Sequence, residues 1–385
     1  ITDPDGHTVS YDYTADGNLG TVTNQLGDTT SYHYTGHYLD KVTGPDVSVM
    51  ARYDYDDTGR LVAVTDGAGN RTQIASDPGA KTETVTSPDG KLTTITTYDA
   101  DGFAATVNQA YGGASHVTSF SYDVAGNVTS PTDPAGSTWK ASYENSLVTS
   151  FTDPTGGMYK MTYDDGYLRT FTDPTGATTC YAWNSKEGTL ASITDPKGDA
   201  ETYGYNSKRQ RTSAVDRRGN EWDWTFTSAG LVASETNPLG NTTSYTYDAE
   251  GRKTAVIDAA GNRSTTTYDA VGNQLTSTDA DGLRTTQTYD SLGRLISTTA
   301  PGGASQDTTY NAAGQRAATN NHVDAPISYE YDSAGREVVR KQDGRTIAQF
   351  SYDPAGRVLT STDAVGATTT YTYDAAGRTL TTTNP

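Results

Sequence analysis

The chain has 385 residues, of which 33% are hydrophobic, and it contains 27 Tyr but only 6 Phe. Large aliphatic residues are too sparse for an ordinary compact core, yet the abundance of Tyr, Thr and Val argues against disorder and favours extended strands. The net charge of −19 argues against a nucleic-acid-binding surface, which needs clustered Lys and Arg, and no apolar run reaches the roughly 18 residues of a membrane span.

A phrase of the form Tyr-Asp-x-x-Gly recurs along the chain. Its early copies are weak, and their aromatic residues stand at steps of 20 to 24 residues, except for a step of 43 between Tyr55 and Tyr98 that hides a degenerate copy near Ser76. These early positions are Tyr13, Tyr34, Tyr55, Tyr98, Tyr122, Tyr143, Tyr163, Trp183, Tyr205 and Phe226. From Tyr247 to Tyr373 the period is a regular 21 residues. About 18 repeats therefore account for nearly the whole chain, and we predict that residues 1–385 form a single array without a linker.

In the regular copies, Tyr ends a strand, Asp begins a turn and Gly closes that turn. These repeat-defining structural residues are Tyr247, Asp248, Gly251, Tyr268, Asp269, Gly272, Tyr289, Asp290, Gly293, Tyr331, Asp332, Gly335, Tyr352, Asp353, Gly356, Tyr373, Asp374 and Gly377.

A second turn phrase lies between the Tyr phrases. It reads TDPDG at 2–6, TDPTG at 152–156 and 172–176, TDPKG at 194–198 and DAAGN at 258–262. Asp and Pro favour the first two positions of a type I turn, and Gly tolerates the left-handed conformation that closes a hairpin. A turn is therefore expected every 10 or 11 residues.

The six or seven residues between turns alternate and are rich in Thr and Tyr, as in RTTQTY at 284–289, which is typical of a strand. The predicted fold is all-β, a continuous antiparallel meander of about 36 strands. A sheet of that length must twist and coil, into a spiral shell, a barrel or a solenoid-like ribbon. The YGGAS stretch at 111–115 falls in a 24-residue step and is predicted to be a lengthened loop.

The best copies of the first phrase extend to Arg: YDDTGR at 55–60, YDAEGR at 247–252, YDSLGR at 289–294, YDSAGR at 331–336, YDPAGR at 352–357 and YDAAGR at 373–378. In this phrase and its period, residues 2–385 resemble the RHS/YD-repeat family. The resemblance implies a β-ribbon that spirals into a hollow shell. Bacterial polymorphic toxins and insecticidal toxin complexes use such a shell to enclose a toxic domain, and teneurins and wall-associated bacterial proteins carry related arrays.

The chain also departs from the toxin members of that family. Residues 363–385 are still ordinary repeat and do not match the core region whose Asp residues release the toxin, so self-cleavage is not carried over to any residue here. Because residue 1 is Ile and the last repeat stops within a turn, we expect a segment of a larger protein, whose remaining parts, such as an enclosed toxin domain, are its first partners.

The sequence contains no recognisable arrangement of catalytic residues. His33 and His37 flank a turn and lack further ligands, so no metal or cofactor site is predicted. DADG at 99–102 and 279–282 is one residue too short for an EF-hand opening, and each Asp is expected to cap its own turn. Cys180 replaces the Ser or Thr of other repeats, and no Gly-x-Ser-x-Gly elbow occurs.

The four Trp residues all lie within 139–232, and three of them, Trp139, Trp222 and Trp224, are the candidate ligand contacts. The leading hypothesis is a non-enzymatic wall segment of a large secreted or surface-delivered bacterial protein, placed outside the cell or on its surface. The alternatives are a surface adhesin that binds glycans or a protein, and a self-assembling extracellular fibre, since an uncapped sheet edge can template the next chain.

Overall fold

The computed structural model describes residues 1–385 and contains 35 β-strands and no helix, one strand fewer than the period predicts. The strands are β1 Ser10–Tyr13, β2 Leu19–Thr23, β3 Thr29–Thr35, β4 Tyr38–Thr43, β5 Val49–Tyr55, β6 Leu61–Asp66, β7 Arg71–Asp77, β8 Thr82–Thr86, β9 Thr93–Tyr98, β10 Ala104–Tyr111, β11 Ala114–Ser119, β12 Lys140–Glu144, β13 Leu147–Thr152, β14 Met158–Asp164, β15 Tyr167–Thr172, β16 Thr178–Asn184, β17 Thr189–Thr194, β18 Ala200–Tyr205, β19 Arg211–Val215, β20 Glu221–Phe226, β21 Val232–Thr236, β22 Thr242–Tyr247, β23 Lys253–Ile257, β24 Arg263–Tyr268, β25 Gln274–Thr278, β26 Arg284–Tyr289, β27 Leu295–Thr299, β28 Ser305–Tyr310, β29 Arg316–Asn320, β30 Ile327–Tyr331, β31 Glu337–Gln342, β32 Arg345–Tyr352, β33 Val358–Asp363, β34 Thr368–Tyr373 and β35 Thr379–Thr383.

Each strand pairs with the next one along the chain, so the predicted antiparallel meander is confirmed. Its predicted continuity is wrong at one place, because β1–β11 and β12–β35 form two sheets of 11 and 24 strands. Between Ser119 and Lys140 only isolated bridges remain, such as Ser119 with Thr132. Pro131 lies in this stretch and has no N–H to donate to a ladder, which is one physical reason for the interruption.

A bulge precedes the Tyr of each regular repeat. In β22, Thr246 pairs with Ala255 but Tyr247 pairs with Lys253, so the register shifts between the two residues. The following turn is closed by a hydrogen bond from the Gly251 N–H to the Asp248 carbonyl at 3.1 Å, and Gly251 has a φ of 81°. This is a type I turn followed by a left-handed Gly, a common short hairpin connection.

The lengthened loop predicted at YGGAS is wrong. Tyr111 pairs directly with Ala114, and only Gly112 and Gly113 connect β10 to β11. Both glycines have positive φ, 57° and 78°, as a tight two-residue hairpin requires. The extra residues of this repeat lie instead in the eight-residue strand β10 and in the irregular stretch that follows β11.

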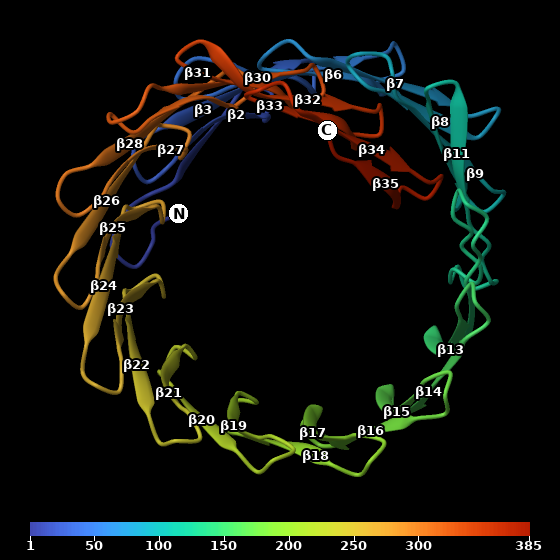
Figure 1. Ribbon diagram of the computed structural model, residues 1–385, viewed down its shortest axis with the longest axis vertical. Coiled ribbons are helices and arrows are strands. Elements are labelled where there is room, and N and C mark those ends of the chain that lie inside the picture. Colours follow the sequence, from blue (N-terminus) through green and yellow to red (C-terminus); the bar gives the residue numbers. More distant parts are fainter.

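The ribbon winds around a ring for more than one full turn, so that its last strands overlap its first strands (Figure 1). Neither sheet closes on itself, since β1 does not pair with β11 and β12 does not pair with β35. Of the three forms allowed by the sequence, the closed barrel is therefore excluded, and the ribbon is an open spiral. No helix capable of crossing a membrane is present.

The sheet is a single layer and has no ordinary core. Only 7 of the 385 residues are buried, and Ala63 and Ala255 are the only hydrophobic ones among them. Along β20, Trp222, Trp224 and Phe226 are half-buried while the residues that alternate with them are exposed, as expected when successive side chains point to opposite faces. Cross-strand pairs on one face therefore provide the packing that a core provides in a compact domain.

Candidate functional site at the seam of the spiral

The carboxylate of each well-formed turn is used within that turn. The Asp258 Oδ1 accepts the backbone N–H groups of Ala260 and Asn262, both at 2.9 Å. Hydrogen bonds from the Asn262 side chain and backbone hold the pKa of Asp258 below its usual value. No group of three or more His, Cys, Asp or Glu side chains is arranged to hold a metal ion.

The phrase Tyr ties neighbouring turns together through its hydroxyl group. The Tyr247 Oη donates to the Val232 carbonyl at 2.7 Å, and Val232 directly follows the preceding Tyr-phrase turn. The same bond, to the carbonyl 15 residues earlier, is made by Tyr143, Tyr163, Tyr268, Tyr289, Tyr310, Tyr331, Tyr352 and Tyr373. Trp183 replaces Tyr in this role, since its Nε1–H donates to the Leu168 carbonyl at 2.8 Å.

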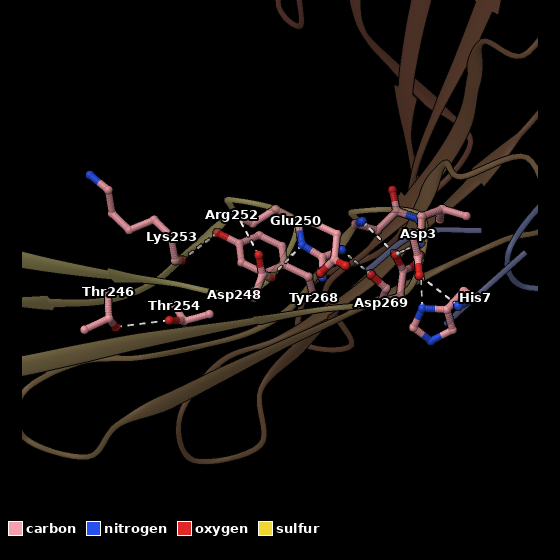
Figure 2. Close-up of polar contacts among 12 residues, drawn as sticks. Asp3, His7, Thr246, Asp248, Glu250, Arg252, Lys253, Thr254, Tyr268 and Asp269 are labelled. Carbon is pink, nitrogen blue, oxygen red and sulfur yellow. Dashed lines mark hydrogen bonds and ion pairs between the residues drawn. The ribbon is translucent and has the colours of Figure 1, made fainter. Parts of the chain in front are cut away.

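The phrase Arg ties each turn to the next one in the forward direction. The Arg252 Nε donates to the Asp248 Oδ2 at 2.6 Å, and its Nη1 donates to the Asp269 carbonyl at 2.8 Å (Figure 2). The guanidinium also lies over the Tyr268 ring, 5.2 Å from its centre, which adds a cation–π contact. Sequence reasoning used this Arg only as a sign of family resemblance and missed both roles.

The meander places its two kinds of turn on opposite borders of the ribbon. We call the border formed by the Tyr-phrase turns, such as 248–252 and 374–378, the YD rim, and the border formed by the other turns, such as 3–7 and 258–262, the alternate rim. We call one full circuit of the ribbon a winding. The spiral brings the alternate rim of the first winding against the YD rim of the second winding. One contact across this seam joins Arg357 to Tyr111, which are 246 residues apart.

Seven turns of the alternate rim meet seven turns of the YD rim, and we define the seam by these residues. The pairs are 3–7 with 248–252, 24–28 with 269–273, 44–48 with 290–294, 66–70 with 311–315, 87–91 with 332–336, 111–114 with 353–357 and 133–137 with 374–378.

Part of the seam is apolar and closely packed. One pocket between the two windings of the ribbon is lined by Leu26, Pro45, Met50, Val271 and Leu292. Further along, backbone meets backbone: a Cβ atom added at Gly67 would lie 2.3 Å from the Ala312 carbonyl oxygen and 2.6 Å from that of Val49. A side chain at position 67 would therefore prevent this approach of the two rims.

Charged groups also meet across the seam. The Arg336 Nη2 lies 4.0 Å from the Asp89 Oδ2, and these side chains are only 19% and 14% exposed. The Arg357 Nη2 donates to the Tyr111 Oη at 3.1 Å. The Ser48 hydroxyl group, and with a smaller effect the charge of Arg294, lower the pKa of Asp46. At Asp46 and Asp89 the alternate rim thus presents a carboxylate where the YD rim presents a guanidinium group, whereas in the first pair the carboxyl groups of Asp5 and Glu250 also lie together.

The structure does not gather the three Trp residues predicted to contact a ligand. Trp139 precedes β12 and is 37% exposed, whereas Trp222 and Trp224 lie far along the same sheet in β20. The Trp224 Nε1–H donates to the Glu235 Oε2 at 3.2 Å, and Arg211 lies over its ring at 5.0 Å. Their ligand contact stays a prediction.

The other residues singled out from the sequence are also dispersed. His33 pairs with Asp40 at 2.6 Å, and His37 bonds Asn18 at 3.0 Å, so the two imidazoles have separate partners. Cys180 is an exposed thiol on β16.

Three comparisons place these observations beside known proteins. The RHS Repeat family model matches residues 226–263, 268–305 and 352–385. The crystal structure of TcdB2-TccC3 is similar over 98% of this chain, with a TM-score of 0.76 and 15% identity, and the TcdB2-TccC3-TEV structure matches equally well. The Tc holotoxin pore of Photorhabdus luminescens matches with a TM-score of 0.57 and 15% identity. This chain spans about a quarter of the length of the TcdB2-TccC3 chains, and no curated protein matches it in sequence.

Proposed function

Because the chain is built from repeats of the RHS/YD type, we propose that it is a non-enzymatic segment of the wall of a protein shell. The observation that carries this proposal is the seam, in which successive turns of one winding pack on successive turns of the next. A ribbon that packs on itself in this way forms a wall. The fold shared with the TcdB2-TccC3 structures supports the same role.

The larger assembly is the further part of the proposal. A wall segment that spans about a quarter of each similar chain needs other segments to complete an enclosure. We place it in a large bacterial protein that is secreted or delivered to the surface, with an enclosed toxin domain as the cargo. The net charge of −19 keeps such a long sheet surface soluble.

Electron microscopy of the full-length parent protein tests the proposal directly. We expect a closed, hollow particle whose wall follows the spiral of Figure 1. An extended thread with separated windings would refute the wall role, and a closed particle with an empty interior would refute only the enclosed cargo.

A glycan-binding role is the alternative, and the placement of Trp222 and Trp224 on one face of β20 favours it. Under this alternative we expect the chain to bind glycans on an array, and we expect the Trp222→Ala/Trp224→Ala double variant to lose that binding. A matched control is Trp183→Phe, since Trp183 is used within the repeat. An array without signal for the unaltered chain would eliminate this alternative.

A further inference from the structure

The Arg of the Tyr phrase is not distributed evenly over the repeats. Among the seven YD-rim turns in the seam, Arg follows the Gly in five, at Arg252, Arg294, Arg336, Arg357 and Arg378. Among the YD-rim turns outside the seam, Arg follows the Gly only at Arg60. The residue is therefore concentrated where the YD rim faces another winding of the ribbon.

Within the first five seam pairs, the YD rim alternates in charge. Arg252, Arg294 and Arg336 are separated by neutral amides at Asn273 and Gln315. A forward hydrogen bond is not special to Arg, because Gln315 reaches forward to the Gly335 carbonyl at 3.0 Å just as the Arg252 guanidinium reaches the Asp269 carbonyl. Forward bonding alone therefore does not explain why Arg and amide alternate.

The facing alternate rim alternates in step. The third residue of its turns is Asp5, then Leu26, then Asp46, then Ala68, then Asp89. In the five alternate-rim turns that follow the seam, the same position holds Thr155, Thr175, Lys197, Arg218 and Leu239, none of them acidic. Asp281 is the one acid at this position on the uncovered part of this rim.

The pairing of the turns places these two patterns in phase. Asp5 faces the turn of Arg252, Asp46 that of Arg294 and Asp89 that of Arg336, while Leu26 and Ala68 face the turns of Asn273 and Gln315. A slip of the seam by one repeat, toward the preceding YD turn, would bring Asp46 and Asp89 against the turns of Asn273 and Gln315. The same slip would bring Asp5 against the turn of Leu231, and Arg252 and Arg294 against the turns of Leu26 and Ala68. The Asp89 side chain is only 14% exposed and would lose the nearby Arg336 guanidinium, so the slipped seam is disfavoured.

We propose that this alternation is a recognition pattern that fixes the register of the seam, so that each turn of the second winding docks on one particular turn of the first. The partner of the alternate rim is thus an Arg-bearing YD rim whose first five turns carry a charge at every second repeat. The inference uses the wall geometry on which the proposed function also rests. It adds a statement of which repeat packs on which, and the two can fail separately.

Disulfide trapping in the full chain, with Cys180→Ser as background, reads the register. A Cβ atom at Gly44 would lie 3.0 Å from the Leu292 Cδ2, so Gly44→Cys with Leu292→Cys reports the observed register. Gly44→Cys with Val271→Cys reports a slip of one repeat, because position 271 lies one repeat before 292 and adjacent repeats are about 10 Å apart.

The charge variants are Asp89→Arg, Arg336→Asp and their combination. We expect each single variant to lower the rate of in-register cross-linking about fivefold, to allow the slipped cross-link, and to be corrected in the combination. Arg336→Asp also loses its own contacts to Asp332 and Tyr352, but the combination would not correct a defect confined to these contacts. The control variant is Arg60→Glu. Arg60 belongs to the same sequence phrase but lies outside the seam, so this variant should leave both cross-links unchanged.

Three results would overturn the inference: single variants that cross-link like the unaltered chain, a combination that fails to restore the rate, or an equal effect of Arg60→Glu. In each case the seam would close through its apolar contacts alone. The proposed wall function would survive those results, because it needs a closed seam but no particular register.

Discussion

Three strands each contain one tyrosine with a hydrogen-bonded hydroxyl group and one tyrosine without this bond. In β14, β22 and β34, one Tyr bonds a carbonyl of the neighbouring repeat, and another Tyr of the same strand makes no hydrogen bond through its hydroxyl. The bonded residues are Tyr163, Tyr247 and Tyr373, at 2.9, 2.7 and 2.7 Å from their acceptors. Their matched controls are Tyr159, Tyr245 and Tyr371.

Tyr→Phe at a bonded position removes one neutral hydrogen bond and keeps the ring, which should cost about 1 kcal/mol. The three sites are far apart, so the triple variant should lose about 3 kcal/mol. An unfolding entropy of about 2.1 cal/mol/K per residue amounts to about 0.8 kcal/mol/K for 385 residues. The expected fall in Tm is therefore about 4 °C for the bonded triple variant, if the chain unfolds as one unit, and less than 1 °C for the control triple.

Thermal melting compares the two triple variants, and native-state hydrogen exchange localises the effect. A loss of 1 kcal/mol should speed exchange near Tyr247 about fivefold through local opening, while Tyr245→Phe leaves it unchanged. Equal effects of the bonded and control variants would show that the rings alone hold the repeats, and would refute the role assigned to the hydroxyl groups.

Three further predictions follow from the turns and the seam. Hydrogen bonds hold the pKa values of Asp216, Asp258 and Asp374 below the usual 3.8, so the stability they provide is complete well above that pH and is lost as the pH falls through the lower folded values. Melting temperatures should therefore fall below about pH 4, with a shallower fall in Asp216→Asn/Asp258→Asn/Asp374→Asn; an unchanged pH profile would contradict this. Gly67→Ala should destabilise by about 1–3 kcal/mol in chemical denaturation and weaken the cross-link between positions 44 and 292, whereas Gly79→Ala, outside the seam, should not weaken it. Chelation with EDTA should leave Tm unchanged, because the Asp279 Oδ1 already accepts two backbone N–H groups at 3.0 and 2.9 Å; a drop of several degrees would indicate a bound cation.

The local architecture could be predicted from the sequence because it is encoded within each repeat. Asp248 and Gly251 specify a turn by their own hydrogen bonding and conformation, and Thr and Tyr specify the strands between turns. Residue counting alone failed at Tyr111, because a longer step does not say whether the added residues enter a loop or a strand. It also failed at Pro131, where the step is ordinary but the ladder is interrupted.

The seam could not be predicted in the same way. Arg357 and Tyr111 meet because a small twist accumulates over the many strands between them, and no local signal gives the number of repeats in one winding. A trace of the seam is nevertheless visible in the printed sequence. The alternation of Arg252, Asn273, Arg294, Gln315 and Arg336 occurs at a spacing of 21 residues, and only the structure shows what it faces.

A sheet one layer thick separates neighbouring positions of the sequence into two independent chemical surfaces. In β20, the exposed face carries Glu221, Asp223 and Thr225, and the opposite face carries Trp222, Trp224 and Phe226. Because no core links the two sets, mutations can accumulate on one side of the ribbon without disturbing the packing of the other. Evolution could therefore adapt the two faces of the ribbon at different rates, within the same 21-residue unit.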